Sequence, residues 1–149
     1  MKKVLFIAAL LIGFAGMANS QVDSKAIGLR FGNAGEISYQ HPFSDANRLE
    51  LDLGFGSWAY GGLYLNGIYH WVWDLSALAD GFNWYAGVGG AVGVNSGNLG
   101  LGVLGQVGLE YNFAGIPLQA SLDWRPTLYV VPGVGLGWDG VALGVRYKF

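Results

Sequence analysis

Residues 141–149, VALGVRYKF, end the chain and decide its fold. Apolar residues occupy every second position of this segment, which is the pattern of a β-strand with one apolar face. That face carries Val141, Leu143, Val145, Tyr147 and Phe149. A chain terminus usually frays unless contacts hold it in place, so we expect this strand to close a sheet.

The other end of the chain has the order of a secretory signal peptide. Two lysines precede an apolar run over residues 4–14, and mainly small residues follow. The run is too short to span a bilayer as a helix, and the lysines argue against the alternative of a buried N-terminal helix. We predict that residues 1–20 are a signal peptide, cleaved after Ser20 or Ala18, and that residues 21–149 form one domain.

The composition favours an exported β-sheet protein. Hydrophobic residues make up 52% of the chain and charged residues only 12%, against about 25% charged in ordinary soluble domains. No second segment is apolar enough for a membrane helix, so the apolar residues must be spread along strands, as in membrane β-barrels. The absence of cysteine excludes disulfides, thiolate metal sites and lipoprotein attachment. Without Lys2 and Lys3 there are 6 basic and 10 acidic residues, a net charge of −4 that disfavours nucleic-acid binding.

Eight segments alternate apolar residues with polar or small ones and are separated by turn signals. They are residues 25–32, 36–43, 49–56, 63–71, 82–94, 99–113, 118–125 and 141–149. Eight strands of about ten residues leave only short connections, of which residues 127–139 form the longest, and no room for a second domain. The sequence therefore predicts an all-β fold, an eight-stranded antiparallel up-and-down transmembrane β-barrel with a filled lumen.

Side-chain volume predicts which face of the strands points inward. The lumen of an eight-stranded barrel is only just wide enough for side chains to fill. The apolar face carries Trp71, Trp84 and Trp124 among many other aromatic residues and leucines, which could not all fit inside. The glycines and the few long polar residues of the other face could fit inside the lumen. We therefore expect the apolar face to meet lipid, with a soluble lipocalin-like barrel as the alternative fold.

Aromatic residues gather near the strand ends, as two interfacial girdles around an apolar band would require. We predict a periplasmic rim of Phe43, Trp71, Trp73, Phe82, Trp84, Tyr111, Phe113, Tyr147 and Phe149. We predict an outer rim of Phe55, Trp58, Tyr60, Trp124, Tyr129 and Trp138.

Residues 21–149 resemble a small eight-stranded outer-membrane barrel of the OmpA/OmpX type. Tyr147-Lys148-Phe149 resembles the C-terminal signal that the barrel-assembly machinery recognises, and residues 82–87 and 121–126 resemble segments of uncharacterised porin-like barrels. The resemblance implies a bacterial outer-membrane location, contact with its lipid, and assembly by that machinery through Tyr147 and Phe149. It implies no function, because this fold hosts anchors, adhesion factors, enzymes and plugged pores. OmpX-type barrels also display long protruding strands, whereas most outer loops predicted here are short.

Charged residues share the inward face that the alternation predicts. They are Arg30, Glu36, Glu50, Asp52, Glu110, Asp123, Arg125, Arg146 and Lys148. Four basic and five acidic groups in a closed lumen predict a structural network of mutual ion pairs, because an unpaired buried charge is costly. An ion path is the weaker alternative, since eight strands leave no continuous water column.

The two histidines do not predict a catalytic site. A hydrolase needs a nucleophile beside a base; Ser44 follows His41 by three positions, but in a predicted periplasmic turn. The His-x-Ser pair of the barrel deacylases is missing, and His70 is predicted to point into the lumen alone. The glycine-rich residues 87–93 lack the helix and the Lys-Ser/Thr of a nucleotide loop.

These observations predict a function without catalysis. We expect no enzyme activity, no cofactor, no metal and no nucleic-acid partner. The predicted function is that of a monomeric structural or interaction protein of the bacterial outer membrane. A narrow porin-like channel and a lipid-modifying enzyme are the alternatives.

Overall fold

A computed structural model describes residues 2–4, 24–32, 34–55, 62–75, 77–95, 97–131, 133–138 and 140–149. Most of the predicted signal peptide lies outside these ranges, as do Trp58 and Tyr60 of the predicted outer rim. Within the described ranges, no helix has the length and apolar character needed to cross a membrane.

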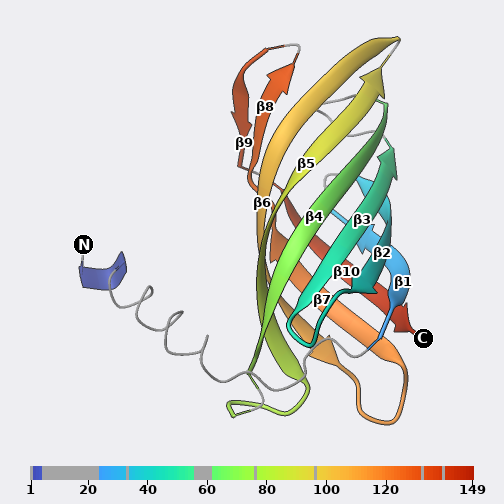
Figure 1. The fold of residues 1–149 in the computed structure, drawn as a ribbon, viewed down its shortest axis with the longest axis vertical. Coiled ribbons are helices and arrows are strands. Elements are labelled where there is room, and N and C mark those ends of the chain that lie inside the picture. The colour runs from blue at the N-terminus through green and yellow to red at the C-terminus, as the bar shows by residue number, and fades with distance from the viewer. Residues whose placement is uncertain are drawn as a thin grey trace.

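The described chain forms ten strands of one antiparallel sheet (Figure 1). The strands are β1 (Ala26–Phe31), β2 (Gly35–Pro42), β3 (Asn47–Phe55), β4 (Leu63–Asp74), β5 (Phe82–Asn95), β6 (Asn98–Asn112), β7 (Leu118–Trp124), β8 (Thr127–Val131), β9 (Gly135–Gly137) and β10 (Val141–Lys148).

Eight of these described strands close into a ring, which confirms the predicted eight-stranded antiparallel barrel. Each strand from β1 to β6 pairs with the next strand in sequence, so that β6 pairs with β7. Strand β7 then pairs with β10. The last strand then pairs with the first, from Phe31 opposite Leu143 to Ala26 opposite Lys148. The segment VALGVRYKF therefore closes the sheet, and the ring is left without an edge strand.

Strands β8 and β9 lie outside the ring, beside the upper part of β6 (Figure 1). Our assignment of residues 127–139 to a connection was wrong. Beyond Pro126 the chain continues along β6, with Thr127 opposite Leu104. Proline has no N–H to donate to the ladder, but its carbonyl accepts the N–H of Gly105 at 3.0 Å. Pro126 therefore interrupts the strand without ending its course.

The side chains of the ring strands alternate between the lumen and the outer surface. In β3, for example, Arg48, Glu50 and Asp52 are buried, whereas Phe55 is exposed. Among the described residues, most buried positions of the ring are polar, charged or glycine, and the exposed large side chains are leucine, valine, isoleucine and aromatic residues. This arrangement confirms that the apolar face is the outer face of the barrel.

We call the end of the barrel at which β1 begins and β10 ends the proximal end, and the opposite end distal. Towards the distal end, an apolar cluster fills the lumen: Tyr64, Ile68, Ala91 and Leu104 are buried together. Tyr129, which we predicted at the outer rim, is half-buried and packs against this cluster. Tyr129 therefore lies beside the distal part of β6, opposite Gly102, and packs towards the lumen cluster.

Candidate functional site in the lumen

The lumen holds a network of buried charges that come from β1, β2, β3, β6, β7 and β10 and from Arg125, which follows β7. Each of these side chains is no more than 5% exposed. In the described part of the chain they are four arginines and five carboxylates: Arg30, Arg48, Arg125, Arg146, Glu36, Glu50, Asp52, Glu110 and Asp123.

Arg30 of β1 joins carboxylates of two other strands. Its Nε lies 3.0 Å from Oδ2 of Asp123 in β7, and its Nη2 also donates to this carboxylate. Its Nη1 lies 3.1 Å from Oε2 of Glu36 in β2. The hydroxyl groups of Tyr64 and Tyr85 donate to Glu36 and Asp123, at 2.7 and 3.3 Å. Both carboxylates are therefore held by charged and neutral donors at once.

Arg125, which follows β7, reaches the carboxylates of β2 and β3. Its Nη1 lies 3.0 Å from Oε1 of Glu36, and its Nη2 donates to Asp52 and lies 3.3 Å from Oε1 of Glu50. Two atoms here have no hydrogen-bond partner among the described residues: Nε of Arg125 and Oδ1 of Asp52. Asn66 lies opposite Asp52 on β4, and its Oδ1 also has no hydrogen-bond partner among the described residues.

Glu50 is the centre of the network. Besides Arg125, it accepts from Arg146 at 3.3 Å, from Gln40 at 2.7 Å and from Gln106 at 3.4 Å. The guanidinium of Arg146 also donates to the hydroxyls of Ser38 and Ser121, each at 2.9 Å. The serine hydroxyls are therefore partners of an arginine.

Arg48 of β3 forms a bidentate pair with Glu110 of β6. The two N–O distances are 3.1 and 2.8 Å, and Nε of Arg48 donates to Nδ1 of His70 at 3.1 Å. Because Nδ1 accepts this bond, the proton of the His70 ring is on Nε2, which donates to Gln106 at 2.8 Å. His70 is therefore a neutral member of the network, and our expectation that it would lie alone was wrong.

Arg48 was not among the predicted lumen charges, because the predicted third strand began at residue 49. The signal was nevertheless present: Arg48 has the same parity as Glu50 and Asp52, and a strand that began one residue earlier would have included it. Lys148 is half-exposed at the proximal end of β10, whereas the eight other charges that the sequence predicted for the lumen are buried.

Glycines on the inner face make room for the large residues of the lumen. Gly54 lies opposite Tyr64, and Gly108 lies opposite Tyr85. A Cβ atom at Gly108 would lie 2.5 Å from Cζ of Tyr85, and one at Gly54 would overlap the ring of Tyr64. The predicted filling of the lumen by a few long side chains among glycines is confirmed.

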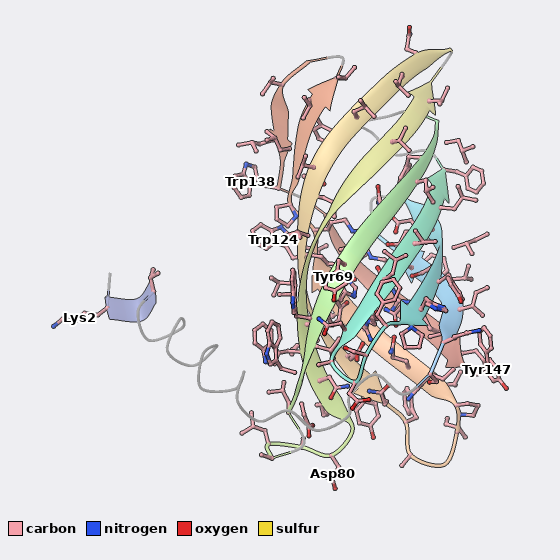
Figure 2. The ribbon with its side chains drawn as sticks, in the orientation of Figure 1. Lys2, Tyr69, Asp80, Trp124, Trp138 and Tyr147 are labelled. Atoms are coloured by element: carbon pink, nitrogen blue, oxygen red, sulfur yellow. The ribbon has the colours of Figure 1, made fainter. Side chains whose placement is uncertain are left out.

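The outer surface brings aromatic residues together near the proximal end, as we predicted. Phe43 stacks on Tyr69, Trp73 stacks on Trp84, and Phe82 contacts Tyr111, which contacts Phe113. On the distal half of the wall, Trp124 stacks on Trp138 with ring centroids 6.0 Å apart (Figure 2). Tyr147 and Phe149, the predicted assembly signal, are both exposed at the proximal end.

The described residues do not place His41 beside a serine nucleophile. Nδ1 of His41 bonds to the hydroxyl of Tyr39 at 3.1 Å, whereas the hydroxyl of Ser44 donates to Asn47 at 2.8 Å. The lumen therefore contains a set of arginine–carboxylate pairs, most of which join strands that are not adjacent in the ring. Comparison of the chain with protein-family models, with curated proteins and with solved structures finds no match.

Proposed function

We propose that this protein is a non-catalytic structural or interaction protein of the bacterial outer membrane, with a lumen closed by its ion-pair network. The observation that carries the proposal is the inverted polarity of the barrel. Charges are buried inside, while leucine, valine and aromatic side chains are exposed around the wall. An apolar exterior of this kind favours aggregation in water, but it is the surface that lipid tails prefer.

The closed ring supports the same proposal. A bilayer offers no water to unpaired backbone groups, so a sheet can cross it only as a closed barrel. Here the pairing of β10 with β1 completes the ring. The aromatic residues near the proximal end have the composition of an interfacial girdle.

The network supports a plug and not a pore. Arg30, Arg125 and Arg146 each bind side chains of strands other than their own. An ion that crossed the lumen would have to separate several of these buried pairs, and each separation leaves a charge without a partner. It would also have to pass the apolar cluster around Tyr64 and Ile68.

Membrane fractionation tests the location. We expect the protein in the outer-membrane fraction, with a gel mobility that changes on heating because the folded barrel resists detergent. A protein recovered from the soluble periplasm with unchanged mobility would overturn the membrane assignment.

Planar bilayers test the plug. We expect the purified, folded protein to give no steady conductance steps. Regular steps that persist after repurification would replace the plug with a narrow porin-like channel. Hydrolysis or transfer of a labelled lipid acyl group that is lost in His41→Ala would favour an enzyme instead.

A further inference from the structure

The lumen network has one carboxylate more than it has guanidinium groups. Within the described residues, five carboxylates and four arginines are buried together. His70 adds no charge, because its Nδ1 accepts a hydrogen bond from Arg48. Lys148 is half-exposed at the proximal end and lies outside this buried set. With every carboxyl group ionised, the lumen would hold one surplus negative charge, which is costly in a closed barrel.

The hydrogen bonds of the carboxylates show where this surplus lies. Asp52 is the exception among them: its Oδ2 accepts from Nη2 of Arg125, but its Oδ1 has no partner among the described residues. The other four carboxylates accept a bond from an arginine at both of their oxygens; they are Glu36, Glu50, Glu110 and Asp123. The surplus charge therefore belongs to Asp52.

A second acceptor without a donor lies beside Asp52. Asn66 of β4 is opposite Asp52 of β3, and the two side chains are 4% and 0% exposed. The Cβ atoms of opposite residues in an antiparallel pair are about 4.5–5.5 Å apart, so these two short side chains are neighbours. Oδ1 of Asn66 also has no partner among the described residues. Two neighbouring acceptors thus lack one hydrogen between them.

We infer that Asp52 is the proton-binding site of the lumen, a neutral carboxylic acid at neutral pH whose Oδ1–H donates to Oδ1 of Asn66. One proton from solvent removes the surplus charge and supplies the hydrogen that both acceptors lack. A proton needs no cavity, whereas a metal cation would need room beside the guanidinium that already binds this carboxyl group. The inference rests on the packing of the lumen and extends the proposed plug, which is complete only with its proton.

The surroundings of Asp52 support this assignment. Asp52, Glu36 and Glu50 share the guanidinium of Arg125. Glu36 and Glu50 each bind a second arginine, whereas Asp52 binds Arg125 alone among the described residues. The charged or titratable groups around Asp52 are Glu50 of the same strand, Glu36 of β2, Arg30 of β1, Arg146 of β10, Tyr64 of β4 and Arg125.

Infrared spectroscopy of the folded protein in detergent at neutral pH tests the inference. A protonated carboxyl group has a carbonyl stretch at higher frequency than carboxylate and amide groups. We expect one such band, which Asp52→Asn removes. Asn66→Leu takes away the acceptor but keeps the acid, so the band should move to higher frequency. Asp45→Asn, at an exposed aspartate between β2 and β3, is the matched control and should keep the band unchanged.

The pH dependence of unfolding gives a second measurement. An aspartate in an unfolded chain loses its proton near about pH 4, so a native state that keeps the proton becomes less stable as the pH rises above this value. Relative to Asp52→Asn, the unfolding equilibrium constant of the unaltered protein should rise about tenfold per pH unit from about pH 5 to 7. For Asp45→Asn the ratio to the unaltered protein should stay constant.

The outcomes separate this inference from the proposed function. The absence of a protonated carboxyl band, or a constant ratio of the unfolding constants of Asp52→Asn and the unaltered protein, would overturn the proton site. A band that persists in Asp52→Asn would assign the proton to another carboxyl group and overturn it as well. Each of these results could be obtained with a correctly inserted, heat-modifiable barrel, and would then leave the proposed function in place.

Discussion

Arg48 and Glu110 form a bidentate ion pair that joins β3 to β6, which are separated in the ring by β4 and β5. The guanidinium also lies over the ring of Tyr85, 4.9 Å from its centroid. The two residues are 62 positions apart in sequence. A pair of this kind ties the two walls of the barrel together across the lumen.

Breaking this pair should destabilise the barrel strongly. In Arg48→Met, Glu110 keeps its charge but loses both charged hydrogen bonds, and we expect a loss of about 3–5 kcal/mol in the free energy of unfolding. Guanidinium titration in detergent micelles, followed by tryptophan fluorescence, measures it. The double variant Arg48→Met/Glu110→Gln should be more stable than Arg48→Met, because no buried charge is left alone. Asp80→Asn, at an exposed turn, is the control and should change little (Figure 2).

The two neighbouring carboxylates of β3 should respond differently to neutralisation. Glu50 accepts from Arg125, Arg146, Gln40 and Gln106, so Glu50→Gln should cost about 3 kcal/mol of unfolding free energy. Asp52 has one oxygen without a partner, and the described lumen has one more carboxylate than guanidinium groups. We therefore expect Asp52→Asn to be neutral or stabilising in the same titration. The reverse order of the two variants would show that charge balance does not control this site.

Adding a methyl group at an inner glycine should overpack the lumen. In Gly54→Ala the new Cβ would overlap the ring of Tyr64, and overpacking of this kind costs about 1–3 kcal/mol. Thermal unfolding, read from the gel mobility after heating, gives the change in midpoint. Gly35→Ala has open space around the new Cβ and should leave the midpoint unchanged. If the overlap is the cause, Gly54→Ala/Tyr64→Leu should recover part of the loss.

The C-terminal phenylalanine should matter for assembly more than for stability. The side chain of Phe149 is 58% exposed, although its backbone N–H donates to the carbonyl of Lys25 at 2.8 Å. We expect Phe149→Ala to reduce the amount of folded barrel in cells several-fold while the purified protein refolds in detergent with nearly unchanged stability. Leu143→Ala, at an exposed residue of β10 with the same alternation as Phe149, is the matched control for lost apolar surface. Equal assembly of Phe149→Ala and the unaltered protein in cells would contradict the signal role.

Strand number and the orientation of the faces were predictable because both depend on local sequence. A period of two residues fixes which side chains share a face, and the volume of a narrow lumen decides which face is inside. Arg30, Glu50 and Arg146 were placed correctly on these grounds. The same alternation would have placed Arg48 in the lumen, but the predicted strand began at residue 49, whereas β3 begins at Asn47.

The pairing of the charges could not be predicted, because it depends on contacts between distant segments. Arg125 and Glu36 are 89 positions apart, and Arg146 and Ser38 are 108 apart. The alternation of residues predicts that these side chains point into the lumen, but it does not predict their height along the barrel axis. Which groups meet depends on the register of every strand. The course of β8 is a similar case, because the pairing of Thr127 with Leu104 across the break at Pro126 is visible only when β6 lies beside it.

A closed, eight-stranded barrel with charges inside and apolar residues outside could therefore be predicted from the residues alone, since a period of two and side-chain volume are local properties of the chain. Which arginine binds which carboxylate, and the extension of the wall by β8 and β9, depend on the folded arrangement. These features arise where strands meet in one particular register, and no segment carries that information without its neighbours.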